Sequence, residues 1–313
     1  MIIGTWTYDA KDSFDDFIEP FVDKGFDVFI TPGVLNSRRV MPDWGQTITN
    51  IHNFVRDGAE HDVMGMVNTV WDDGGFAFFS IDWYGVAYSA DQSWNPQEMD
   101  LPWFNQRFNQ AVNIDPTDYF TESLLRLKEI GDFIPTNGMN QKIVWMKLIP
   151  EKNKSLNLST DEWDRVLEVC DQAQDLLWQA SPQLNGDELS YFDFIIELYR
   201  FLAQIRYNLL DASEHYEESI NIQKENPVDT RSNLIYILDL VDETITLQEN
   251  IITQYRNLWL NENHTYSLDI ILNRFREVVG DLREMQNLVF ESLTMFDSGK
   301  PILSKSEVSL DIN

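Results

Sequence analysis

The sequence predicts an α/β segment over residues 1–116, followed by an all-α part, an antiparallel helical bundle, over residues 117–313. Up to about residue 116, runs of β-branched and aromatic residues alternate with helical patterns, which is typical of parallel strands joined by crossover helices. Beyond that point the strand-like runs stop and long amphipathic stripes replace them. Such stripes are typical of helices that each bury one face against their neighbours.

Three strand-like runs occur in the first segment: "IIGTWTY" at 2–8, "DVFITPG" at 27–33 and "DVMGMVNTVW" at 62–71. The third is nearly all apolar, and such a run suits a parallel sheet that is buried on both faces. We therefore expect three adjacent parallel strands with right-handed crossovers.

Helical patterns fill the intervals between and after these strands. Residues 11–26 carry phenylalanines, Ile18 and Val22 at helical spacing, with Gly25 as the stop signal. Residues 43–60 repeat the pattern, and residues 76–94 form a third helical segment. The later stripes predict four further helices, at 161–180, 188–216, 234–259 and 266–291.

The net charge of −29 excludes some classes of partner. Residues 1–116 hold 18 acidic and 6 basic residues and the rest of the chain holds 34 and 17, so the acidity is not confined to a tail. A field of this sign repels phosphate backbones and anionic lipid, so we expect neither nucleic acid nor a membrane as partner. A neutral ligand remains compatible. The single Cys170 excludes an internal disulfide, and the opening residues do not predict a signal peptide.

Residues of a kind suited to sugar binding follow the predicted strands. Trp6, Asn36, Trp71 and Asp73 all fall at the carboxyl ends of these strands, where βα folds place their binding groups. Tryptophan can stack on a flat ring, and a carboxylate or an amide can hydrogen-bond hydroxyls. Core packing is the alternative for both tryptophans, and Asn36 could instead cap the turn after Pro32.

The first hundred residues resemble the last three βα units of the catalytic barrel of glycoside hydrolase family 20, the β-N-acetylhexosaminidases. A tryptophan, Trp6, ends the first strand, and the second runs into a Thr-Pro turn, "TPGVLNS". The third ends in "VWDDGG", and its helix closes with "YGVAYSADQSW". The resemblance implies a partial (β/α) barrel of the TIM type, which by itself is too short to close.

The resemblance also implies roles for five residues. Trp6 and Trp71 would surround the 2-acetamido group and stack beneath the pyranose ring, with Trp44 as a further wall. Asp73 would hydrogen-bond the hydroxyls farthest from the cleaved bond. Asn36 stands where many members have an aspartate. The implied ligand is a glycan that contains N-acetylhexosamine.

On this basis the chain is expected to be the C-terminal portion of a glycosidase that removes terminal β-linked N-acetylhexosamine by a substrate-assisted, retaining mechanism. The Asp-Glu pair of that mechanism belongs to an earlier barrel strand. The motif "NGDE" at 185–188 mimics it but opens a predicted helix, where capping is the simpler role. No catalytic residue is therefore assigned, and the chain alone is expected to be inactive.

The sequence also bears on metal binding, assembly, compartment and an alternative function. The scattered histidines predict no metal site, and no cofactor is implied. Unpartnered strand edges would favour self-association or a partner that supplies the missing barrel strands. Family members are often periplasmic or secreted, but this sequence does not indicate the compartment. The alternative function, from a different class, is a non-catalytic carbohydrate-binding or helical interaction protein.

Overall fold

The computed structural model describes residues 1–37, 39–73, 76–97, 100–113, 116–133, 159–180 and 186–311, with the backbone alone for 113, 131–133 and 186–188. The chain divides into two compact units. The first comprises Met1–Ile143 and Glu168–Ile196, and the second comprises Val144–Leu167 and Glu197–Asn313. None of the described helices combines the length and the apolar character needed to cross a membrane.

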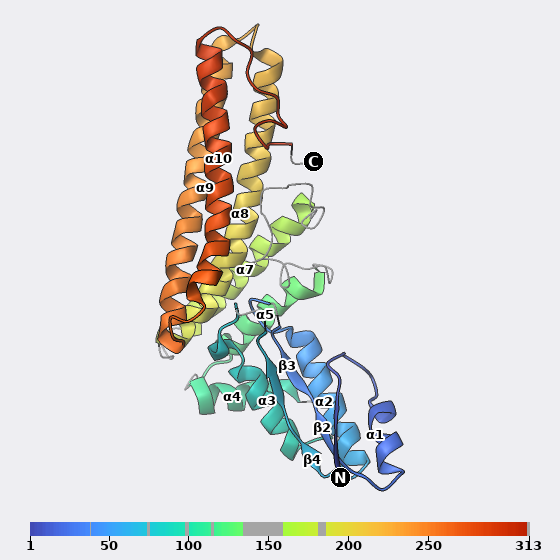
Figure 1. The fold of residues 1–313 in the computed structure, drawn as a ribbon. Coiled ribbons are helices and arrows are strands. Elements are labelled where there is room, and N and C mark those ends of the chain that lie inside the picture. The colour runs from blue at the N-terminus through green and yellow to red at the C-terminus, as the bar shows by residue number, and fades with distance from the viewer. Residues whose placement is uncertain are drawn as a thin grey trace. The chain divides into compact units, whose positions relative to one another are not determined.

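The strands of the first unit form two small parallel sheets (Figure 1). The larger sheet has the order β1-β2-β4 and consists of β1 (Ile2–Trp6), β2 (Asp27–Thr31) and β4 (Gly65–Met66). The smaller one pairs β3 (Gly33–Leu35) with β5 (Thr69–Trp71). All three pairings are parallel, with Ile2 opposite Asp27, Phe29 opposite Gly65 and Leu35 opposite Trp71.

Pro32 accounts for the interruption of the run predicted at 27–33. A proline has no N–H, so it cannot donate to a strand ladder, and β2 ends directly before it. Backbone pairing nevertheless continues past it, because the Val67 amide donates to the Ile30 carbonyl and the Thr69 amide donates to the Pro32 carbonyl, both at 3.0 Å. The two sheets are thus consecutive parts of one interrupted ladder.

Helices surround these strands in the first unit. Its described helices between α1 and α5 are α1 (Asp15–Val22), α2 (Trp44–Glu60), the 3-10 turn η1 (Phe79–Ile81), α3 (Trp83–Trp94), α4 (Leu101–Phe108), the π-turn η2 (Asn109–Asn113) and α5 (Tyr119–Phe133). The side chain of Asp43 caps α2 by accepting a hydrogen bond from the Gln46 amide. Gly25 follows α1 with a φ of +76°, a value that favours glycine.

Aromatic rings dominate the core of this unit. Phe14 stacks on Phe54 with ring centroids 4.3 Å apart, which joins the start of α1 to α2. Trp44 meets Tyr84 edge to face at 5.2 Å, and Tyr84 in turn meets Phe104 at 5.3 Å. These contacts join α2, α3 and α4. Edge-to-face aromatic pairs stabilise such packing by more than the burial of their apolar area alone.

The second unit is built mainly from long helices. These are α9 (Pro227–Glu262), α10 (Leu268–Asp297) and most of α8 (Gly186–Ile222), whose residues up to Ile196 belong to the first unit. The shorter α7 (Thr160–Ala180) begins in the second unit and continues in the first. Short turns connect α8 to α9 and α9 to α10, and consecutive helices lie side by side in alternating directions (Figure 1). The segment after α10 folds back, with the Tyr216 hydroxyl donating to the Leu303 carbonyl at 3.0 Å and with Val308 fully buried.

The expected fold class is wrong. The structure is 69% helical, and within the described residues the strands form only the two small sheets, so it is a mostly helical protein and not a barrel segment joined to an antiparallel bundle. The physical reason is the shortness of the strands. The longest span five residues, and the pairing predicted to run from 63 to 71 is reduced to β4 and β5, of two and three residues.

Candidate functional site

Two exposed tryptophans lie at the carboxyl ends of strands in the first unit. Trp6 is the last residue of β1 and is 67% exposed, and Trp71 is the last residue of β5 and is 43% exposed. Indoles this accessible are costly to leave in water, because a tryptophan presents a large apolar surface. Because they also lie at the carboxyl ends of parallel strands, where βα folds gather their ligands, they mark a candidate ligand surface.

Tyr8 fixes the position of the Trp71 ring. The two rings meet edge to face with their centroids 5.5 Å apart. The indole Nε1 of Trp71 donates a 3.0 Å hydrogen bond to the Thr69 hydroxyl, which lies 3.4 Å from the Tyr8 hydroxyl. The indole is therefore held by a ring contact and a hydrogen bond while much of its surface stays open to solvent.

Gly33 permits the close approach of these groups. A Cβ atom at this position would lie 2.7 Å from the Thr69 hydroxyl oxygen and 2.9 Å from the Tyr8 ring. Real Cβ atoms essentially never come so close, so any larger residue would displace Tyr8 or Thr69. The glycine thus belongs to the geometry of the surface even though it presents no side chain.

Helix α2 holds the segment that carries Tyr8. The Gln46 amide group donates to the Tyr8 carbonyl at 2.6 Å. The side chain of Asn50 donates to the carbonyls of Thr7 and Asp9, at 2.9 and 3.1 Å, and accepts from the Gly33 amide at 3.2 Å. Asn50 is fully buried, so these bonds satisfy backbone groups that have left the strand ladder.

The same face of α2 continues these contacts along residues 7–14. Asn53 donates to the Lys11 carbonyl at 2.7 Å, and Asp57 accepts from the Phe14 amide at 2.6 Å. We call the row Gln46, Asn50, Asn53, Arg56 and Asp57 the polar row of α2, because each member bonds the backbone of residues 7–14. This irregular segment is therefore positioned by side chains of the helix beside it.

The other predicted site residues have different surroundings. Asp73 is exposed in the turn after β5. Asn36 is fully buried, and its side chain donates to Asp82, just before α3, at 3.1 Å. Trp44, the first residue of α2, is 1% exposed and packs on Tyr84. In this structure neither Asn36 nor Trp44 has a surface open to a ligand.

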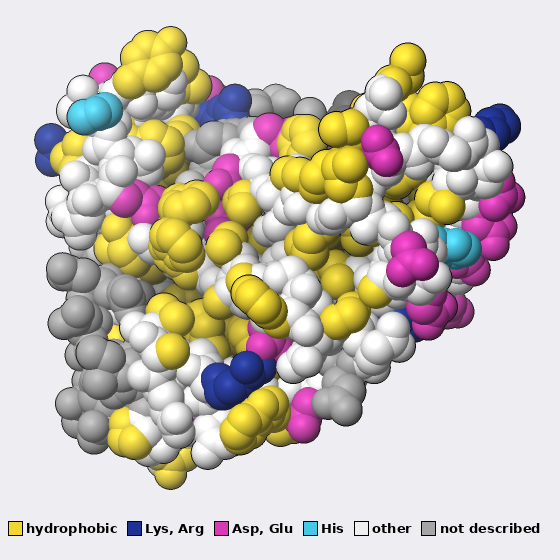
Figure 2. Space-filling model, turned by 90° about the horizontal axis from the view of Figure 1, so that it is seen from below, with side chains coloured by type: hydrophobic (Ala, Val, Ile, Leu, Met, Phe, Trp, Pro, Cys, Tyr) yellow, Lys and Arg dark blue, Asp and Glu magenta, His cyan; other side chains and the backbone are white. Residues whose placement is uncertain are grey.

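We define the strand-end surface as Trp6, Tyr8, Trp71 and Asp73. Within it the structure brings Tyr8 into contact with Trp71, and it places Trp6 two residues before Tyr8. Exposed tryptophans also occur elsewhere in this unit, at Trp83, Trp94 and Trp103. One face of the molecule shows hydrophobic side chains distributed among polar and acidic ones (Figure 2).

Burial affects the acid–base behaviour of two tyrosines of α3, Tyr84 and Tyr88, in the core of the first unit. It raises the pKa of Tyr84 and of Tyr88 well above the usual tyrosine value, so both phenols stay neutral at physiological pH. Tyr84 uses its hydroxyl to donate to Asn105 at 2.7 Å. Its role is therefore structural.

Sequence reasoning missed Tyr8 and the polar row of α2. The alternation of side chains along a strand puts Tyr8 on the same side as Trp6, two residues earlier, and this pattern could have indicated Tyr8. The "NGDE" motif lies outside what the structure describes: Asn185 has no described position, and the side chains of Asp187 and Glu188 are not described.

Comparisons with known proteins give no family assignment. No protein-family model matches the chain, and no curated protein matches its sequence. The resemblance to glycoside hydrolase family 20 stays a prediction carried by the residues quoted above.

Proposed function

We propose that the strand-end surface binds a pyranose ring of a glycan that contains N-acetylhexosamine, and that it acts as the substrate-binding wall of a β-N-acetylhexosaminidase-type subsite. The observation that carries the proposal is the exposure of Trp6 and Trp71 at the carboxyl ends of parallel strands. The carboxyl ends of strands are where βα folds gather their ligands.

The side chains on this surface suit a sugar. The apolar C–H face of a pyranose can stack on an indole, and its hydroxyls can donate to a carboxylate such as that of Asp73. The contacts of Trp71 with Tyr8 and Thr69 hold its ring in place before a ligand arrives, so little rotamer entropy remains to be lost on binding. A neutral sugar is also compatible with the net charge of −29.

The roles proposed for the chain's own residues are binding and orientation. Trp6 and Trp71 would stack against the ring and exclude water, while Asp73 would accept hydrogen bonds from hydroxyls. No described residue is proposed as the acid that protonates the leaving group. The chain alone is therefore expected to bind the glycan without cleaving it. The alternative function, a non-catalytic carbohydrate-binding protein, predicts the same behaviour.

Removing the Trp71 ring tests the proposal. Chitotriose is titrated into the full chain, and binding is followed by isothermal calorimetry. Burial of one aromatic side chain contributes about 1.5–3 kcal/mol, so Trp71→Ala should weaken binding by roughly tenfold to a hundredfold. Trp94→Ala is the matched control, because Trp94 is 87% exposed but lies at the end of α3, away from the strand ends.

Two results would contradict the proposal. One is the absence of any binding by the wild-type chain, and the other is equal binding by wild type, Trp71→Ala and Trp94→Ala. A chromogenic β-N-acetylglucosaminide tests the catalytic part separately. Hydrolysis above background that is lost in Glu188→Gln would show that the "NGDE" motif is catalytic and that a binding role is too narrow.

A further inference from the structure

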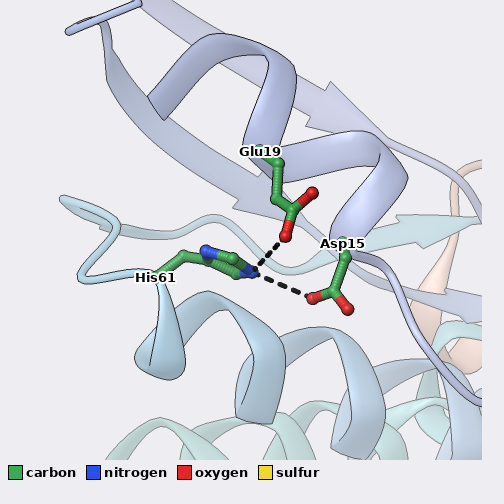
Figure 3. A group of neighbouring side chains, drawn as sticks. All are labelled: Asp15, Glu19 and His61. Carbon is green, nitrogen blue, oxygen red and sulfur yellow. Dashed lines mark hydrogen bonds and ion pairs between the residues drawn. The ribbon is translucent and has the colours of Figure 1, made fainter. Parts of the chain in front are cut away.

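Three potential metal ligands converge at the junction of α1 and α2. Asp15 and Glu19 lie four residues apart on α1, and His61 directly follows α2 (Figure 3). The Nε2 atom of His61 is 2.9 Å from Oδ1 of Asp15 and 3.9 Å from Oε1 of Glu19. The three ligand atoms all lie within 4.8 Å of one another.

An imidazole can hydrogen-bond only one carboxylate well through a single nitrogen. Here Asp15 already occupies that position, and yet the second carboxylate also points at Nε2 (Figure 3). Two carboxylates on one side of a helix, one turn apart, repel each other unless a cation lies between them. A divalent cation could bind both carboxylates and the imidazole nitrogen at the same time.

We propose that Asp15, Glu19 and His61 form a binding site for a divalent transition-metal ion, with Zn²⁺ as the best match. Zinc binds carboxylate oxygen and imidazole nitrogen at about 2.0–2.2 Å in tetrahedral geometry, which places neighbouring ligand atoms about 3.4 Å apart. The two distances from His61 Nε2, 2.9 and 3.9 Å, lie on either side of this value. Small rotations of two partly exposed carboxylate side chains would close the site.

The ligand set also selects among metals. An imidazole nitrogen favours zinc and other transition metals, whereas magnesium and calcium prefer oxygen ligands throughout. Three protein ligands leave the fourth tetrahedral position to water. Asp15 and Glu19 are about half exposed, so that position is open to solvent.

The place of the site in the fold predicts its effect. Arg56 and Asp57 of the polar row contact the backbone at Asp12 and Phe14, and His61 lies one turn farther along the same chain. A bound ion would extend this row and attach the first turn of α1 to the end of α2. It would therefore stabilise the first unit, and this inference does not depend on carbohydrate binding.

The experiment uses the full chain after treatment with EDTA and gel filtration. Zn²⁺ is titrated by isothermal calorimetry in buffer with excess Mg²⁺, which occupies weak sites on so acidic a surface. We expect one tight equivalent of Zn²⁺ per chain and a rise in Tm on adding it. Glu19→Gln and His61→Gln should each weaken this binding at least about tenfold, because even loss of a second-shell partner costs about 10- to 100-fold.

Matched controls separate the site from general charge effects. Asp16→Asn removes a neighbouring exposed carboxylate, and His264→Gln removes an exposed imidazole in the second unit, so neither should change the affinity. Circular dichroism confirms that each variant is folded. The proposal is overturned if wild type shows no tight equivalent, or if Glu19→Gln and His61→Gln bind Zn²⁺ as tightly as the two controls.

Discussion

Helices α2 and α10 bury one face each by different means. The buried face of α10 is almost wholly apolar, running from Leu268 through Leu282 to Leu293, with Ser292 as its polar member. The buried face of α2 includes Thr47, Asn50, His52 and Asp57 among its apolar residues. The two buried faces differ in polarity because the two helices pack against different kinds of structure. Within the second unit, α10 packs beside another helix, whose backbone groups are already bonded, whereas α2 also covers the irregular segment 7–14.

This difference shows that a polar face can be a packing face. Backbone groups outside regular structure need partners when they are buried, and α2 supplies them from side chains. An apolar helix in its place would leave the carbonyls of Thr7 and Asp9 without these bonds. Stability should therefore rest on apolar volume in α10 and on hydrogen bonds in the polar row of α2.

The largest effect is expected from a cavity in the apolar face. Leu282 is fully buried in α10, so Leu282→Ala should reduce the free energy of unfolding of the second unit by about 2–5 kcal/mol. Ile270→Ala, at an exposed position of the same helix, should change it by about 0.5 kcal/mol or less. Urea unfolding followed by circular dichroism measures both, and equal effects would contradict the assignment of the buried face.

A smaller but specific loss is expected in the polar row. Asn50→Ala removes one buried bond, to Gly33, and two part-buried bonds, to Thr7 and Asp9, and leaves these backbone groups without that partner, at a cost of about 1–3 kcal/mol. Asn53→Ala removes one partly buried bond, to Lys11, and should cost less. If chemical denaturation showed Asn50→Ala to be neutral, hydrogen bonding would not be what holds segment 7–14 on α2.

The smallest effect concerns the pH dependence of the pair Asp15–His61, which lies one helical turn beyond the polar row of α2. A hydrogen bond from His61 lowers the pKa of Asp15 below its ordinary value of 3.8. The stabilisation of the folded state by this hydrogen bond is therefore present above pH 3.8 and is lost as the pH falls through the lowered pKa of Asp15. In metal-free protein, Asp15→Asn should cost less than about 1 kcal/mol near pH 5.5, because the pair is partly exposed, and the difference should shrink as the pH falls below 3.8. A difference that grew on acidification would show the opposite shift.

The apolar periodicity of the sequence located the helices well. The stripe at 234–259 lies inside α9, and the stripe at 266–291 lies inside α10 except for its first two residues, because the spacing of the apolar residues directly records a continuous apolar face. The strands were expected to be longer than they are. Pairing at 27–35 is divided at Pro32, and how far a ladder extends depends on partners that are distant in sequence.

Only part of the candidate site could be predicted from the sequence. Trp6 and Trp71 could be placed at strand ends from sequence alone, and the structure exposes both. The burial of Asn36 and Trp44 could not be predicted, because it depends on how α2 and α3 pack around β3, with Trp44 against Tyr84 and Asn36 against Asp82. The same holds for the meeting of His61 with Asp15, which lies 46 residues earlier.

The polar row of α2 also bears on the order in which the first unit folds. Its bonds to residues 7–14 join groups that are 38 to 44 residues apart in the chain. Closing loops of this length costs entropy before any contact is gained, so such contacts form late in folding. We therefore expect segment 7–14 to become ordered only after α2 has docked against the strands. Because the ring of Trp71 contacts Tyr8, it should acquire its final position in that last step.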